Sequence, residues 1–78
     1  MIIELSRGHI TLRSGTRTIE VQGELLGPPP YSPNFVVYAD RILNWEDGSP
    51  VSVAERDSIL ELLRDDMAAR GLSIEIER

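Results

Sequence analysis

The sequence predicts an α+β fold, in which a four-stranded, mostly antiparallel meander is followed by one long helix packed on one sheet face and by a C-terminal fifth strand. Short segments of the first half alternate apolar and polar residues, which is typical of strands with one buried face. One later segment instead repeats its apolar residues at spacings of three and four, which is typical of a helix. With 78 residues there is room for one core, so we expect a single α+β domain over residues 1–78.

The helix is predicted at about residues 52–71. Ser52 is a favourable N-cap, and Glu55 follows three residues later, so the two can form a capping box. Gly71 stands where a left-handed residue commonly ends a helix. The predicted apolar stripe, which needs a sheet to cover it, consists of Ile59, Leu60, Leu63 and Met67.

Three strands are predicted before the proline-rich segment, at Met1–Leu5, His9–Arg13 and Arg17–Gln22. The dipeptide Ser14-Gly15 between the second and third is a turn signal, so these two strands are expected to form a β-hairpin. Gly23 is interpreted as a β-bulge that follows the third strand.

The fourth strand is predicted at Phe35–Tyr38, and Ile42–Trp45 is expected to continue it after a bend. The helix is long enough to be a crossover, so the last strand, Leu72–Ile76, can run parallel to the fourth. Phe35–Tyr38 is apolar on both faces. Either the proline segment covers its second face, or that face is a patch open to a partner.

The composition limits the class of partner. The formal net charge is −5 and no basic stripe exists, which disfavours nucleic acid as a ligand. No apolar stretch approaches the roughly 20 residues of a membrane span. Met1–Glu4 lacks the pattern of a signal peptide, and the chain has no cysteine, which is compatible with the cytoplasm. We therefore expect a cytoplasmic protein with a protein partner, without cofactor, and with an open oligomeric state.

No catalytic or metal site is predicted. His9 is the only histidine, and catalysis would need it to meet a carboxylate such as Asp40 or Glu46 in one pocket. A lone histidine in an alternating strand is more typical of an exposed position. Asp40, Glu46 and Asp47 lack the spacing of a calcium loop, and Asp65–Asp66 is interpreted as a solvated helix face. A small enzyme or ligand-binding domain that uses His9 remains an alternative.

The segment Pro28–Tyr31 fits the Pro-Pro-x-Tyr pattern that aromatic grooves of WW domains recognise in a polyproline helix. The whole segment Gly27–Asn34, which contains four prolines, is expected to be a stiff, extended connection. A rigid loop with Tyr31 packed on it explains the same residues, and we prefer that interpretation. An adaptor that displays this segment remains a second alternative.

The aromatic residues lie in one third of the chain, from Tyr31 to Trp45. Trp and Tyr are common binding hot spots, and an acidic rim suits a basic partner. Core packing is the first expectation for Trp45. The candidate partner-binding residues are Tyr38, Trp45, Glu46 and Asp47.

The segment Phe35–Trp45, the turn with Pro50, the capped helix with Ile59 and Leu63, and the strand pattern Gly71–Ile76 together resemble a family of small bacterial immunity proteins. The resemblance covers about the last 45 residues. It implies a non-enzymatic protein, encoded beside a polymorphic toxin, that binds the toxin domain and occludes its active site or blocks its substrate. The acidic charge would then speed association with a basic toxin.

Overall fold

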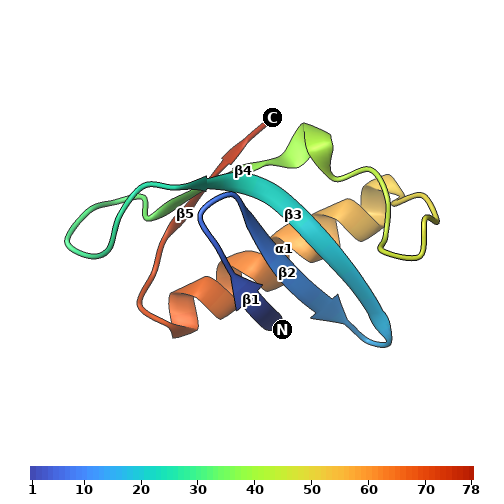
Figure 1. Cartoon of the computed structure of the whole chain (residues 1–78), viewed down its shortest axis with the longest axis horizontal. Helices are drawn as coiled ribbons and strands as arrows, with labels where there is room; N and C mark the ends of the chain where they lie inside the picture. The colour runs from blue at the N-terminus through green and yellow to red at the C-terminus, as the bar shows by residue number, and fades with distance from the viewer.

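A computed structural model describes residues 1–78 as a five-stranded sheet with one α-helix across one face (Figure 1). The elements are β1 (Ile2–Leu5), β2 (His9–Ser14), β3 (Arg17–Leu25), β4 (Phe35–Tyr38), the 3-10 helix η1 (Ala39–Arg41), α1 (Val53–Ala69) and β5 (Ile74–Glu77). The strands follow one another across the sheet in chain order. Neighbours are antiparallel except β4 and β5, which are parallel. The predicted α+β fold is confirmed.

Both ends of α1 form as the sequence predicts. The Ser52 hydroxyl accepts a hydrogen bond from the N–H of Glu55 at 3.1 Å, and the Glu55 carboxylate accepts one from the N–H of Ser52 at 2.9 Å. At the other end Gly71 has a φ of 75°. The N–H groups of Gly71 and Leu72 donate to the carbonyls of Ala68 and Met67, so a Schellman motif ends the helix.

The core lies between α1 and the inner face of the sheet. The helix contributes the predicted stripe, and alternate residues of the strands face it. Each fully buried Leu or Ile stabilises the fold by about 1.5–3 kcal/mol. The core residues are Ile2, Ile10, Leu12, Ile19, Val21, Phe35, Val37, Ala39, Ile42, Trp45, Ile59, Leu60, Leu63 and Met67.

Hydrogen bonds join the edge strand β1 to the C-terminal end of α1. The N–H of Ile2 donates to the Asp66 carboxylate at 2.7 Å, and the carbonyl of Ile2 accepts from the Arg70 guanidinium at 3.3 Å. Asp65 is exposed, but Asp66 is half-buried by this contact. The prediction of a solvated face is therefore wrong for Asp66, because its partner is remote in sequence.

The predicted bulge at Gly23 is wrong. The strand β3 runs through this residue, and the only register shift lies between Ile2 and Glu4 in β1. Gly23 is instead a point of close approach, because a Cβ there would overlap the carbonyl oxygen of Val36 and the ring of Phe35. Glycine is therefore needed at this position because there is no space for a side chain.

The predicted continuation of β4 through Ile42–Trp45 is also wrong. The turn of 3-10 helix at Ala39–Arg41 redirects the chain, and the N–H of Ile42 donates back to Ala39. The following loop is held by hydrogen bonds from Trp45 to Ser49 and from Val51 to Leu43. The buried side chains of Ile42 and Trp45 thus reach the core from a loop.

The proline segment projects from one end of the sheet and leaves the outer face of β4 uncovered (Figure 1). Its anchor is Asn34, a buried residue whose side chain donates to the carbonyls of Gly27 and Tyr31 and accepts from the N–H of Ser73, each at 2.9 Å. The N–H of Tyr31 donates to the carbonyl of Pro28. This closes a turn, so the predicted extended conformation is wrong for Pro28–Tyr31.

The helix α1 is not long and apolar enough to cross a membrane.

Replacing Gly23 by Ala should lower the free energy of unfolding by about 3 kcal/mol, because backbone and a core ring must move to admit the methyl group. Urea denaturation monitored by the fluorescence of Trp45 would measure this. Gly8→Ala is the matched control, because nothing lies within 4 Å of a Cβ at Gly8. The control should change stability by less than about 1 kcal/mol. Equal stability of the two variants would contradict the close approach.

Candidate partner-binding site

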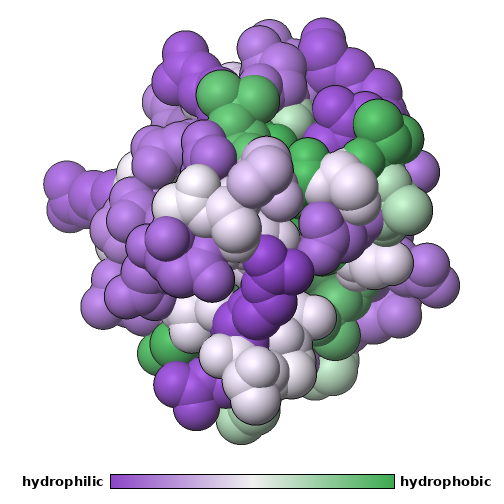
Figure 2. Space-filling view, turned by 90° about the vertical axis from the view of Figure 1, so that its right-hand side faces the viewer, coloured by the Kyte–Doolittle hydropathy of each residue, from purple (hydrophilic) through white to green (hydrophobic).

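The outer face of the sheet, opposite α1, has no helix over it (Figure 1). At the end of this face where the β2–β3 hairpin and the loop after η1 meet, two adjoining hollows of about 460 and 420 Å³ open to solvent. They share Thr18, Trp45 and Glu46, and we call them together the Trp45 groove. Figure 2 faces this end, which is mainly hydrophilic with separate apolar patches. The remaining lining residues are Thr11, Thr16, Arg17, Glu20, Gln22, Asn44 and Asp47.

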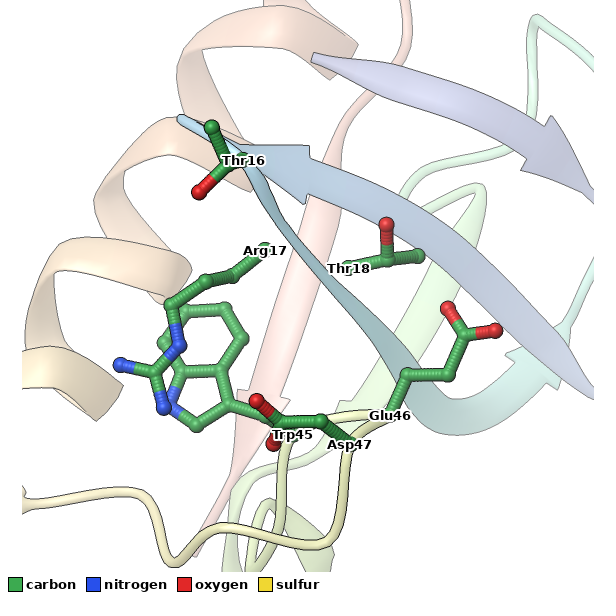
Figure 3. A pocket seen from close by; sticks show the side chains of 6 residues that line it. All are labelled: Thr16, Arg17, Thr18, Trp45, Glu46 and Asp47. Carbon is green, nitrogen blue, oxygen red and sulfur yellow. The ribbon is translucent and has the colours of Figure 1, made fainter.

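Arg17 and Trp45 form the centre of this site. The Arg17 guanidinium lies over the indole of Trp45, 4.3 Å from the ring centre (Figure 3). It also donates to the Glu55 carboxylate at 2.8 Å and to the Ser49 hydroxyl. Trp45 itself is only 5% exposed, so it packs in the core as expected. The hairpin, the loop and the start of α1 are therefore joined through one arginine.

The pKa of the Glu55 carboxyl is lowered from its ordinary value. The N–H of Ser52 is the main cause that lowers the pKa of the Glu55 carboxyl, and the Ser52 hydroxyl and Arg17 lower it further. The buried Nε1 of Trp45 has no hydrogen bond of good geometry, but the indole lies near enough to Glu55 to contribute in the same direction.

The loop after η1 contributes two acidic residues to the groove, Glu46 and Asp47, and only one of their carboxylates is hydrogen-bonded within the protein. Asp47 accepts hydrogen bonds from the hydroxyl and the N–H of Ser49, and these lower the pKa of its carboxyl. The backbone N–H of Glu46 donates to the carbonyl of Thr18 at 2.9 Å, which fixes the loop against β3. The exposed carboxylate of Glu46 points away from Arg17 (Figure 3) and makes no hydrogen bond in the protein. It can pair with a cation from outside.

Tyr38 lies elsewhere on the outer face. It is the last residue of β4, half-buried, and its hydroxyl donates to the Glu24 carboxylate at 3.4 Å. The Arg41 guanidinium is 5.0 Å from the centre of its ring. Desolvation and the charge of Glu24 raise the pKa of Tyr38. The structure thus brings Trp45, Glu46 and Asp47 together and leaves Tyr38 outside the groove.

The sequence did not point to Thr16, Arg17 or Thr18 as site residues. The alternation of β3 places Thr18 on the outer face, and that much can be read from the pattern. The contact between Arg17 and Trp45 has no local signal, because it depends on how the loop after η1 returns to the hairpin.

His9 meets carboxylates other than the expected ones. Its Nε2 lies 2.9 Å from Glu4 and its Nδ1 lies 2.9 Å from the hydroxyl of Ser6 and 3.7 Å from Glu20. The predicted pairing with Asp40 or Glu46 is not formed. None of the four hollows in the molecule is lined by His9.

Fold and site define a small acidic α+β protein with one open sheet face and a polar groove at the end of that face. The sequence matches the family model described as Immunity protein 74 over residues 2–77, so the chain belongs to this family of immunity proteins. The match includes the N-terminal strands and the proline segment, beyond the 45 or so residues in which the resemblance was evident. No curated protein and no solved structure matches the chain.

The lowered pKa of Glu55 predicts a pH dependence of stability. Because the folded state favours the charged form, the stabilisation is complete above the ordinary pKa of 4.5 and is lost as the pH falls below it. Glu55→Gln keeps a capping-box side chain but removes the charge. We expect this variant to be less stable than the wild type at about pH 7 and the difference to shrink progressively as the pH falls below 4.5. Urea unfolding across this range would show it; a constant difference would contradict it.

Proposed function

We propose that this protein is a non-enzymatic immunity protein that binds and neutralises a cognate bacterial toxin domain in the cytoplasm of the producing cell. The observation that carries the proposal is the family match over residues 2–77. The structure adds an open sheet face and a preformed groove, and both suit binding of a macromolecule. The net charge of −5 supports a basic protein as partner.

Four residues are proposed to act in this binding. Tyr38, Glu46 and Asp47 would contact the toxin directly, since each has exposed atoms on the outer side. Trp45 is buried, and we assign it the role of holding Arg17 and the acidic loop in place. Such buried supports keep a binding surface preorganised, which lowers the entropy cost of association.

One observation favours a second function. The hydroxyl of Ser6, the ring of His9 and the carboxylate of Glu4 are hydrogen-bonded in series, as in hydrolases that use an activated serine. The Ser6 hydroxyl, however, is also bonded to the backbone of His9, and no hollow adjoins the three residues. These contacts explain the cluster as a closure of the turn between β1 and β2, so the cluster needs no catalytic role.

The adaptor function has less support than the toxin-binding function. Tyr31 is 68% exposed and thus accessible to a partner. The turn from Pro28 to Tyr31 is, however, not the extended polyproline helix that aromatic grooves recognise.

Co-expression tests the proposed function. We expect bacteria that express the toxin domain encoded beside this gene to stop growing, and we expect this protein to restore growth. The two proteins should co-purify, and their complex should weaken when salt is raised from about 0.05 to about 0.5 M, because charge pairing is screened. Toxicity that this protein leaves unchanged would rule out the function.

His9→Ala tests whether neutralisation needs catalysis. Because we assign no chemical step to His9, the variant should restore growth as well as the wild type does. The Ser6→Ala variant is a matched second test in the same cluster. Loss of rescue in both, with an unchanged circular dichroism spectrum and unchanged toxin binding, would favour the hydrolytic alternative over simple binding.

A further inference from the structure

The outer face of the sheet concentrates the negative charge of the molecule. Residues that pair in register share a face, so the strand pairing places five glutamates there with one strand arginine, Arg13. A second arginine, Arg41 of η1, lies beside the ring of Tyr38. The exposed side of α1 instead mixes both signs, with Arg64 between Glu61 and Asp65. The glutamates are Glu4, Glu20, Glu24, Glu75 and Glu77.

Three of these glutamates surround an apolar centre. Val36 pairs with Glu24 on one side and with Glu75 on the other, while Tyr38 pairs with Glu77 and donates to Glu24. We call these five residues the β4 patch. Val36 and Tyr38 are half-buried and the glutamates are exposed. An aromatic and aliphatic centre inside a charged rim is the usual anatomy of a protein interface.

The glutamates of the rim form no ion pair within the protein. Arg17 pairs with Glu55 and His9 contacts Glu4 and Glu20, so Glu24, Glu75 and Glu77 have no cation within ion-pair distance. Arg41 lies beside the patch, with its guanidinium 5.0 Å from the centre of the Tyr38 ring, but forms no ion pair with these glutamates. Glu24 and Glu75 flank one residue on adjacent strands and are thus about 10 Å apart. Their repulsion gives the isolated fold no benefit, and a bound cation would remove it.

This charge also selects among partners. Nucleic acid and anionic membranes would be repelled, and a second copy docked through the same patch would bring another acidic rim against it. A protein surface rich in lysine and arginine is complementary. Its long side chains could extend to the rim while their apolar stems pack on Tyr38.

We propose that the β4 patch is the docking surface for a basic surface of the toxin domain, with Tyr38 and Val36 at the centre of the contact. This rests on the proposed function and adds Glu24, Val36, Glu75 and Glu77 to its binding residues. Glu24, Glu75 and Glu77 pair with lysine or arginine side chains of the toxin. Glu46 and Asp47 in the Trp45 groove would extend this contact from the loop after η1.

Charge reversal at matched positions tests the proposal. The variant Glu24→Lys/Glu75→Lys changes the patch, and Glu61→Lys/Asp65→Lys changes the net charge equally on the exposed side of α1. Binding to the toxin domain encoded beside the gene would be measured by calorimetry. We expect the patch variant to bind at least about 100-fold more weakly and the helix variant less than about 5-fold more weakly, since like charges brought together in an interface oppose association strongly.

Each other outcome overturns the proposal. If both variants weaken binding equally, only net charge matters and the patch is not the contact. If the patch variant binds like the wild type while the wild type neutralises the toxin, the patch is wrong and the proposed function stands. If the wild type does not bind, both fall. If circular dichroism shows that the lysine variant is unfolded, the variant Glu24→Gln/Glu75→Gln replaces it. We expect this variant to bind the toxin domain about 10-fold more weakly than the wild type. Unchanged binding would contradict the proposed patch.

Discussion

The apolar stripe of α1 packs against one face of a five-stranded sheet, and no second α-helix covers the other face. Ile59, Leu63 and Met67 belong to the same buried core cluster as strand residues such as Ile10 and Val21. Because burial of these side chains is the main stabilising term, the sheet must present its apolar residues to α1 and its polar residues to solvent. The open acidic face is a direct consequence of this one-sided core.

The crossover through α1 decides what that open face contains. The helix returns the chain so that β5 pairs in parallel with β4, which places Glu75 and Glu77 beside Val36 and Tyr38. Asn34 fixes the same end of the sheet, since its buried side chain bonds both the proline segment and Ser73 just before β5. The β4 patch therefore combines residues of the consecutive strands β3 and β4 with residues of β5, which is far from them in the sequence.

The Trp45 groove depends on a different set of contacts. Arg17 bridges the hairpin, the acidic loop and the first turn of the helix, and its guanidinium stacks on an indole that is part of the core. The chain belongs to a family of immunity proteins, which implies in general that its partner is a protein. Contacts that hold a surface in place before binding lower the entropy cost of association.

The sequence by itself determined the elements whose signals are local. The capping box at Ser52, the Gly71 terminus and the period of Ile59, Leu63 and Met67 define α1, and alternation defines the strands. Tertiary structure decided what depends on remote neighbours. A side chain at position 23 would collide with the ring of Phe35, so glycine is needed there. Asp66 accepts a hydrogen bond from the N–H of Ile2, at the other end of the chain. Trp45 contacts Arg17 only because the loop after η1 returns to the hairpin. Capping hydrogen bonds and hydrophobic periodicity involve residues that are close in the sequence, so they can be predicted from it. Steric close approach and contacts between charged groups of remote residues arise only when the chain has packed into its tertiary structure.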